Sequence, residues 1–155
     1  MNSASNRPPH CGWRSRTLEA TAAFVIGGVL VFSAASKLTS PIEFRDELHS
    51  YGLLDVRASM FAALYLILLE LGMGLSFWRK ASRGVSFVAA ALLFSVFLCA
   101  LAYKRSLGDT NHCGCFGSST PGTLAQMVWL DTVLLAVCVL GAVLSLRRDF
   151  GRSLE

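Results

Sequence analysis

Four apolar segments, each about 20 residues long, limit what this chain can fold into. They are expected at about 19–38, 58–78, 82–103 and 124–146. A helix needs about 20 apolar residues to cross a hydrocarbon core about 30 Å thick, so four crossings use most of the 155 residues. Only 15% of the residues are charged, whereas soluble domains average about a quarter. The sequence therefore predicts an all-α membrane protein built as a four-transmembrane-helix bundle.

The ends of the chain are expected outside the bundle. Residues 1–17 are predicted as a disordered cytoplasmic tail, 18–147 as the membrane domain and 148–155 as a second cytoplasmic tail. A cleaved signal peptide is the alternative for the first span, because Arg14 and Arg16 precede it. Its apolar stretch exceeds the usual 7 to 15 residues, however, so we expect the span to be retained as an anchor.

A short amphipathic helix is expected between spans 1 and 2. Residues 40–43, Ser-Pro-Ile-Glu, have the form of a capping box with proline at the first helical position, and Gly52 can end the helix. Phe44, Leu48 and Tyr51 then share one face. We expect this helix to lie on the membrane surface or to pack over the bundle.

The distribution of basic residues predicts the orientation. The two chain ends and the turn between spans 2 and 3 carry nine Lys and Arg residues, namely Arg7, Arg14, Arg16, Arg79, Lys80, Arg83, Arg147, Arg148 and Arg152. The opposite side carries five, namely Lys37, Arg45, Arg57, Lys104 and Arg105. Cytoplasmic loops are enriched in Lys and Arg, so both termini are expected in the cytoplasm of a bacterial inner membrane and the loop around Cys113 outside it. These residues flank the spans and form no single stripe, so the expected partner is the lipid bilayer and not nucleic acid.

The densest group of reactive side chains is the loop His112-Cys113-Gly114-Cys115, predicted on the side where disulfides persist. Alpha carbons two residues apart are at most about 7 Å apart, and a disulfide needs about 4.4–6.8 Å, so the chain must bend to close one. Such a bridge would be strained and readily reduced, which suits exchange better than stapling. We therefore predict Cys113 and Cys115 as a redox pair, with His112 favouring the thiolate.

Other interpretations of these cysteines remain open. His112, Cys113 and Cys115 are soft ligands for copper or zinc, but three ligands are too few for a closed zinc site. A structural or inert loop is a further alternative. Cys99, about one turn from the outer end of span 3, is a candidate partner thiol, although a lone membrane cysteine more often fills apolar space, as expected of Cys138.

Two acids lie inside predicted spans, Glu70 in span 2 and Asp131 in span 4. Acids there are costly and usually face the bundle interior. Glu70 is a candidate proton relay for thiol chemistry, or else a structural partner of Lys37 or of a hydroxyl on another helix, and a structural role is favoured for Asp131. The sequence has no phosphate-binding or dinucleotide-binding glycine motif, so no cofactor is expected. Nothing in it supports a quinone contact.

Several strings of residues resemble the MauE/DoxX family over roughly residues 20–146. They are Ser33-Ala34-Ala35-Ser36-Lys37-Leu38, Pro41, Phe44, Leu48, Tyr51-Gly52-Leu53-Leu54, Glu70-Leu71, Gly74 and Cys113-Gly114-Cys115-Phe116-Gly117. The CGCFG string is the most specific of these. Two departures are Asp55, where a proline is expected, and Leu130 before Asp131, where the family often has a basic residue; the second puts a charge pair there in doubt.

The resemblance implies a redox-associated inner-membrane protein. MauE proper is linked to maturation of the disulfide-rich small subunit of methylamine dehydrogenase, together with a thioredoxin-like partner. The leading hypothesis is a membrane thiol/disulfide redox protein that assists maturation, through disulfide formation or electron relay, of an exported cysteine-containing client protein. The alternatives are a membrane protein that binds or transfers copper or zinc, and a non-catalytic assembly subunit.

Overall fold

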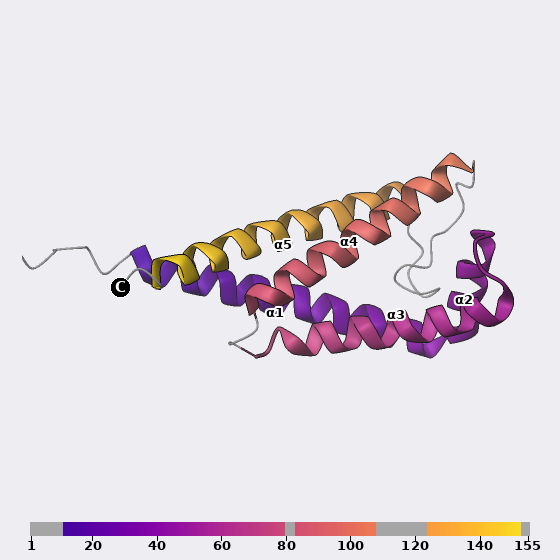
Figure 1. Ribbon diagram of the computed structural model, residues 1–155, viewed down its shortest axis with the longest axis horizontal. Coiled ribbons are helices and arrows are strands. Elements are labelled where there is room, and N and C mark those ends of the chain that lie inside the picture. Colours follow the sequence, from indigo (N-terminus) through magenta and orange to yellow (C-terminus); the bar gives the residue numbers. More distant parts are fainter. Residues whose placement is uncertain (1–10, 80–82, 108–123, 153–155) are drawn as a thin grey trace, which may run out of the picture.

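The computed structural model describes residues 11–79, 83–107 and 124–152. Within these residues there are five helices and no strand. The helices are α1 (Cys11–Thr39), α2 (Pro41–Ser50), α3 (Val56–Ser76), α4 (Arg83–Ser106) and α5 (Leu124–Arg152) (Figure 1). All but α2 are long and apolar enough to cross a membrane. The predicted fold class, a four-span helical membrane protein with a short helix after span 1, is confirmed.

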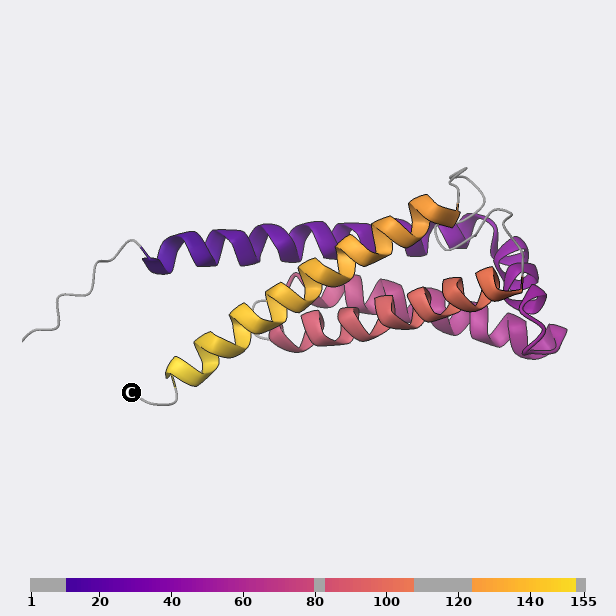
Figure 2. The same cartoon turned by 90° about the horizontal axis from the view of Figure 1, so that it is seen from above.

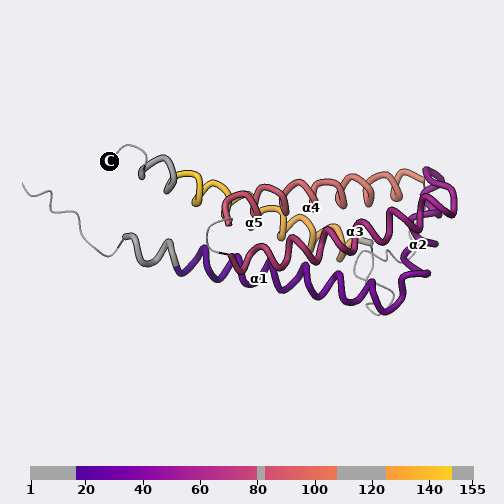
Figure 3. The backbone as a smooth tube through the Cα atoms, turned by 60° about the horizontal axis from the view of Figure 1, so that its bottom comes forward, coloured from indigo at the N-terminus to yellow at the C-terminus, as the bar shows by residue number. Residues whose placement is uncertain are grey.

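The four long helices run along one axis and alternate in direction (Figures 1 and 2). The start of α1 and the end of α5 lie at one end of the bundle, and α2 lies at the other (Figure 3). The end of α4 and the start of α5 are at the α2 end. The segment between α4 and α5 is therefore attached to the bundle at the end opposite the chain termini.

Helices α1 and α5 are longer than the predicted spans, because each continues into a segment that contains charged residues. Helix α1 begins at Cys11, so it includes residues that we expected in the N-terminal tail, and α5 continues to Arg152. Hydropathy marks where a helix can lie in lipid, whereas the helix itself ends where its backbone hydrogen bonds end.

The short helix α2 forms where the sequence predicts it, but its start differs from the expected capping box. Ser40 makes no side-chain hydrogen bond to the helix, and Pro41 occupies the first turn. The turn after α2 uses Gly52 at a φ of 68°, which glycine adopts without strain. The carboxylate of Asp55 then caps α3 by accepting a 2.8 Å hydrogen bond from the Ala58 amide.

The helices form two closely packed pairs, α1 with α3 and α4 with α5, and α2 packs mainly on α3. Helices α3 and α4 are neighbours in sequence but touch each other little. The main core joins α1, α4 and α5, and its members are Ala23, Ile26, Leu30, Phe77, Phe87, Ala90, Leu93, Phe94, Leu134, Cys138 and Ala142. A second core, of Ala34, Phe44, Ala63 and Ile67, lies where α2 meets α1 and α3. Large apolar side chains also cover the outside, such as Phe24, Phe61 and Trp129, which a lipid environment accommodates.

Helices α1 and α3 come close at two glycines, as expected for small residues in a membrane interface. A Cβ on Gly74 would stand 2.8 Å from Val31 Cγ2 and 3.0 Å from the Gly27 carbonyl oxygen. A Cβ on Gly72, two residues earlier on α3, would meet nothing within 4 Å.

We therefore expect Gly74→Ala to lower the free energy of unfolding by about 1–3 kcal/mol, because the added methyl overpacks the interface. Gly72→Ala is the matched control, and it should be neutral or stabilising, since alanine is the better helix former. Unfolding of the purified protein in detergent, followed by circular dichroism, measures both. Equal effects of the two substitutions would contradict this account of the interface.

Candidate functional site

A buried ion pair joins α1 to α3. Lys37 Nζ on α1 lies 2.5 Å from Glu70 Oε1 on α3 and donates a second hydrogen bond of 2.8 Å to Ser33 Oγ. Both ionisable side chains are fully shielded from solvent. Helical side chains lean toward the N-terminus of their own helix, so Lys37 reaches inward from near the end of α1 and passes Ser33, one turn earlier. The pair is therefore internal to the bundle.

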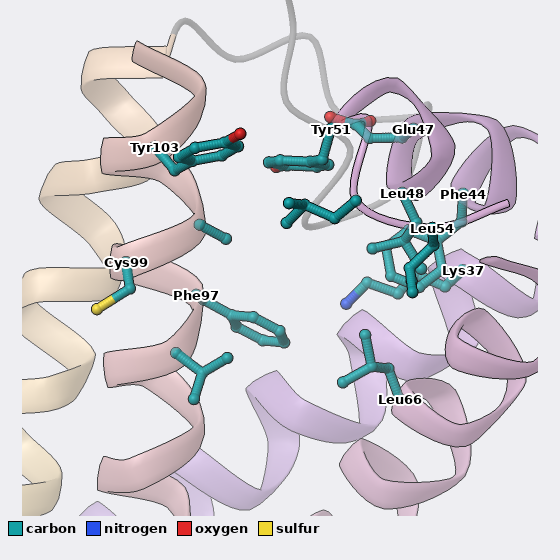
Figure 4. A pocket seen from close by; sticks show the side chains of 13 residues that line it. Lys37, Phe44, Glu47, Leu48, Tyr51, Leu54, Leu66, Phe97, Cys99 and Tyr103 are labelled. Carbon is teal, nitrogen blue, oxygen red and sulfur yellow. The ribbon is translucent and has the colours of Figure 1, made fainter. Parts of the chain in front are cut away.

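Two aromatic rings from other helices surround the same ammonium. Lys37 Nζ lies 5.2 Å from the ring centroid of Phe44 on α2 and 5.3 Å from that of Phe97 on α4. Figure 4 shows the Lys37 amine pointing toward Phe97. Such contacts attract the cation electrostatically when water is excluded. Lys37 thus holds together side chains from α1, α2, α3 and α4.

Asp131 adds a third ionisable group, from α5. It is fully buried, and it is close enough for electrostatic interaction with both Lys37 and Glu70. Among the described residues, neither of its carboxyl oxygens has a hydrogen-bond partner, and Glu70 Oε2 has none either. We call Lys37, Glu70 and Asp131 the buried charge cluster. It contains two acids for one ammonium, so a proton on one acid would make it neutral, and charge neutrality is strongly favoured in an apolar environment.

A pocket of about 400 Å³ lies next to the cluster, between α4 on one side and α2 and α3 on the other (Figure 4). Its walls are almost entirely apolar. The lining residues are Lys37, Phe44, Glu47, Leu48, Tyr51, Leu53, Leu54, Leu66, Val96, Phe97, Cys99, Ala100 and Tyr103. The pocket exists because α3 and α4 separate from each other toward the α2 end (Figure 1).

A second ion pair stands at the outer end of this pocket. Lys104 Nζ on α4 donates a 2.9 Å hydrogen bond to Glu47 Oε1 on α2 and lies 5.6 Å from the ring centroid of Tyr51. The two charged side chains are 7% and 17% exposed, so the pair is more than a solvated surface contact. It ties α2 to the end of α4.

The predicted site residues do not lie together in one place in the described part of the structure. Glu70 lies in the buried charge cluster and pairs with Lys37, one of the partners suggested for it. Cys99 is exposed, and although it is one of the residues that line the pocket, its sulfur points away from it (Figure 4). His112, Cys113 and Cys115 lie outside the described residues, and so does the alternative metal site that they would form. Within the described ranges, no group of three or more potential ligands is close enough to hold a metal ion.

Two features of the site, the burial of Lys37 and the Lys104–Glu47 pair, were not predicted from the sequence. Lys37 was counted as a loop charge because it lies at the edge of span 1, but it is buried. Removing it from the count leaves the charge bias in the same direction. The Lys104–Glu47 pair joins residues 57 positions apart, and no local pattern links them. The sequence signals for the cluster were the acids inside apolar spans and the suggestion of Lys37 as one possible partner of Glu70.

The four spans and the buried charge cluster define a class of protein, a multispan helical membrane protein with ionisable groups in its interior. The model of the family described as methylamine utilisation protein MauE matches residues 15–144. The chain therefore belongs to the MauE family, which confirms the resemblance of its sequence motifs. Comparisons with curated proteins and with solved structures gave no significant match.

Proposed function

We propose that this protein is a thiol–disulfide exchange protein of the bacterial inner membrane that assists maturation of an exported cysteine-containing protein. Cys113 and Cys115 are the exchanging pair, and a thioredoxin-like protein and the client are the partners. Family membership supports a role in methylamine utilisation, for which processing of the methylamine dehydrogenase small subunit is the model.

One observation carries the proposal: α4 ends and α5 begins at the bundle end opposite the chain termini. Cys113 follows Leu107 by six residues, and an extended chain of that length spans about 20 Å. The cysteine pair is thus tethered to the end of the bundle that carries fewer basic residues. The positive-inside rule assigns that end to the extracytoplasmic side, where exported proteins acquire disulfides.

The exchange itself balances without a further reagent. The thiolate of one cysteine attacks a disulfide of the partner protein, one partner sulfur leaves as a thiolate, and a mixed disulfide forms. The second cysteine then attacks the mixed disulfide. The products are a Cys113–Cys115 disulfide and a partner dithiol, so two electrons and two protons have passed to the partner. The reverse sequence oxidises the partner.

Glu70 and Lys37 take the supporting role in this proposal. They lie too deep in the bundle to touch a protein substrate, since both side chains are fully buried. Together with Asp131 they form a group of three buried ionisable side chains, of which the two acids can take up a proton. The cluster can therefore accept and return protons that thiol chemistry releases near the α2 end.

A trapping experiment tests the exchange. A Cys115→Ala variant keeps the attacking thiol of Cys113 but lacks the second one, so a mixed disulfide with a partner should accumulate in cells. It is measured as a reducible, higher-mass band on non-reducing gels and identified by mass spectrometry. The matched control is Cys138→Ala, which alters a cysteine in the apolar core and should trap nothing. If neither Cys113→Ala nor Cys115→Ala yields an adduct, the exchange proposal is wrong.

A further inference from the structure

The pocket beside the buried charge cluster is open to the bilayer. Helices α3 and α4 make few contacts, and Val96 on α4, which lines the pocket, is 59% exposed. In a bundle that spans the membrane, an exposed apolar residue within a span faces lipid. A molecule dissolved in the lipid phase can therefore enter the pocket without passing through water.

The polar groups of the pocket lie at its outer end. Figure 4 shows the rings of Tyr51 and Tyr103 on opposite walls, with their hydroxyl groups pointing toward each other. The Glu47–Lys104 pair stands beside them, and Phe97 and Phe44 line the inner part. Tyrosines are typical of the membrane–water interface, so this end corresponds to the headgroup level. A matching ligand has a flat apolar body and an oxygen that accepts a hydrogen bond from a tyrosine.

We propose that this pocket binds the ring of a lipid-soluble quinone. A quinone ring is flat, stacks on aromatic side chains and carries carbonyl oxygens that accept hydrogen bonds, while its tail extends into lipid through the gap between α3 and α4. A volume of about 400 Å³ is within the range of small-molecule sites. A lipid acyl chain is narrower and would use neither the aromatic walls nor the Tyr103 hydroxyl.

A bound quinone would be the electron acceptor for the proposed thiol–disulfide exchange. This role of the quinone rests on the proposed function. Cys113 and Cys115 lose two electrons and two protons when their thiols form a disulfide. A quinone gains two electrons and two protons to become a quinol, so the two reactions balance. Oxidised Cys113–Cys115 could then be regenerated from within the membrane after each exchange. Binding of the ring itself requires only the described residues.

The test is calorimetric titration of the purified full chain with menadione, a quinone without a long tail, in detergent, with empty micelles as the blank. We expect saturable binding of one menadione per chain. Val96→Trp should weaken binding at least tenfold, because Val96 lines the pocket and the larger indole takes up space at its opening, and Tyr103→Phe should weaken it several-fold by removing one donor. The matched control is Val85→Trp, which places the same side chain on α4 at a position that is 75% exposed and away from the pocket. It should bind as the native chain does.

Three outcomes would overturn the inference: no saturable binding, unchanged affinity in Val96→Trp, or equal binding of decanoate with the same sensitivity to Val96→Trp. The last result would identify an acyl-chain site. A Cys113→Ser/Cys115→Ser variant separates the two proposals, because it should bind menadione normally. If menadione binds but no partner is trapped, the quinone site stands and the exchange proposal is wrong. If a partner is trapped but menadione does not bind, the exchange proposal stands and the quinone site is wrong.

Discussion

Glu70→Leu is expected to lower the free energy of unfolding by about 3–5 kcal/mol, the cost of leaving a buried charge without its partner. The substitution keeps a side chain of similar size but removes the carboxylate, whose Oε1 lies 2.5 Å from Lys37 Nζ. Lys37 is fully shielded and cannot regain its lost stabilisation from water. Unfolding of the purified protein in mixed micelles with increasing sodium dodecyl sulfate measures the change.

The control is the double variant Lys37→Met/Glu70→Leu, which replaces both charges with apolar side chains. Buried ion pairs often contribute little net stability, because desolvation offsets their attraction. The double variant should therefore recover most of the stability that Glu70→Leu loses. If it is as unstable as the single variant, the loss arises from packing and not from the unpaired ammonium.

A further experiment tests whether Asp131 can replace Glu70 as the partner of Lys37. In Glu70→Leu, Lys37 can turn to the remaining acid of the cluster, which would reduce the loss. Asp131→Asn should then cost more in the Glu70→Leu background than in the native chain. A coupling of about 0.5–3 kcal/mol is typical of groups in one network. Additive effects would show that Asp131 does not substitute for Glu70.

Labelling with a membrane-impermeant maleimide should give an all-or-none difference between two ends of the chain. After mild reduction of intact cells whose outer membrane is permeabilised, a variant with Cys113 as its single thiol should react completely. Helix α4 ends and α5 begins at the bundle end assigned to the extracytoplasmic side, so the reagent reaches the loop without crossing the inner membrane.

Native Cys11 is the matched control, because it begins α1 at the opposite end of the bundle. A variant with Cys11 as its single thiol should react only after the inner membrane is disrupted. Reaction of Cys11 but not Cys113 in intact cells would reverse the orientation and contradict the proposed function. Labelling before and after reduction also reports whether the native pair is oxidised.

The sequence predicted the helical elements well because each depends on local information. Apolar length defines the spans, Pro41 and Gly52 bound α2, and the alternation of spans follows from their number. The segment whose chemistry suggested the function, around Cys113 and Cys115, lies outside the described residues, so its redox role stays a prediction.

The arrangement of the helices could not be predicted in the same way. Nothing local indicates that α1 packs on α3 or that α3 separates from α4, because these contacts depend on shape over whole helix faces. Lys37 illustrates the difficulty. A lysine two residues from a helix end normally extends to the headgroups, and only the position of Glu70 on another helix draws it inward.

The pairing of α1 with α3 has a consequence for biosynthesis. A translocon releases spans in the order of synthesis, so α1 and its lysine reach the lipid first, and α3 arrives with the neutralising acid. Both members of the Lys37–Glu70 pair belong to the first two spans, so the pair can form once α1 and α3 have entered the membrane, without residues of α4 or α5. Helices α4 and α5, which pack closely on each other, follow in the chain. The charge of Lys37 can thus be paired while the ribosome is still translating the last two spans.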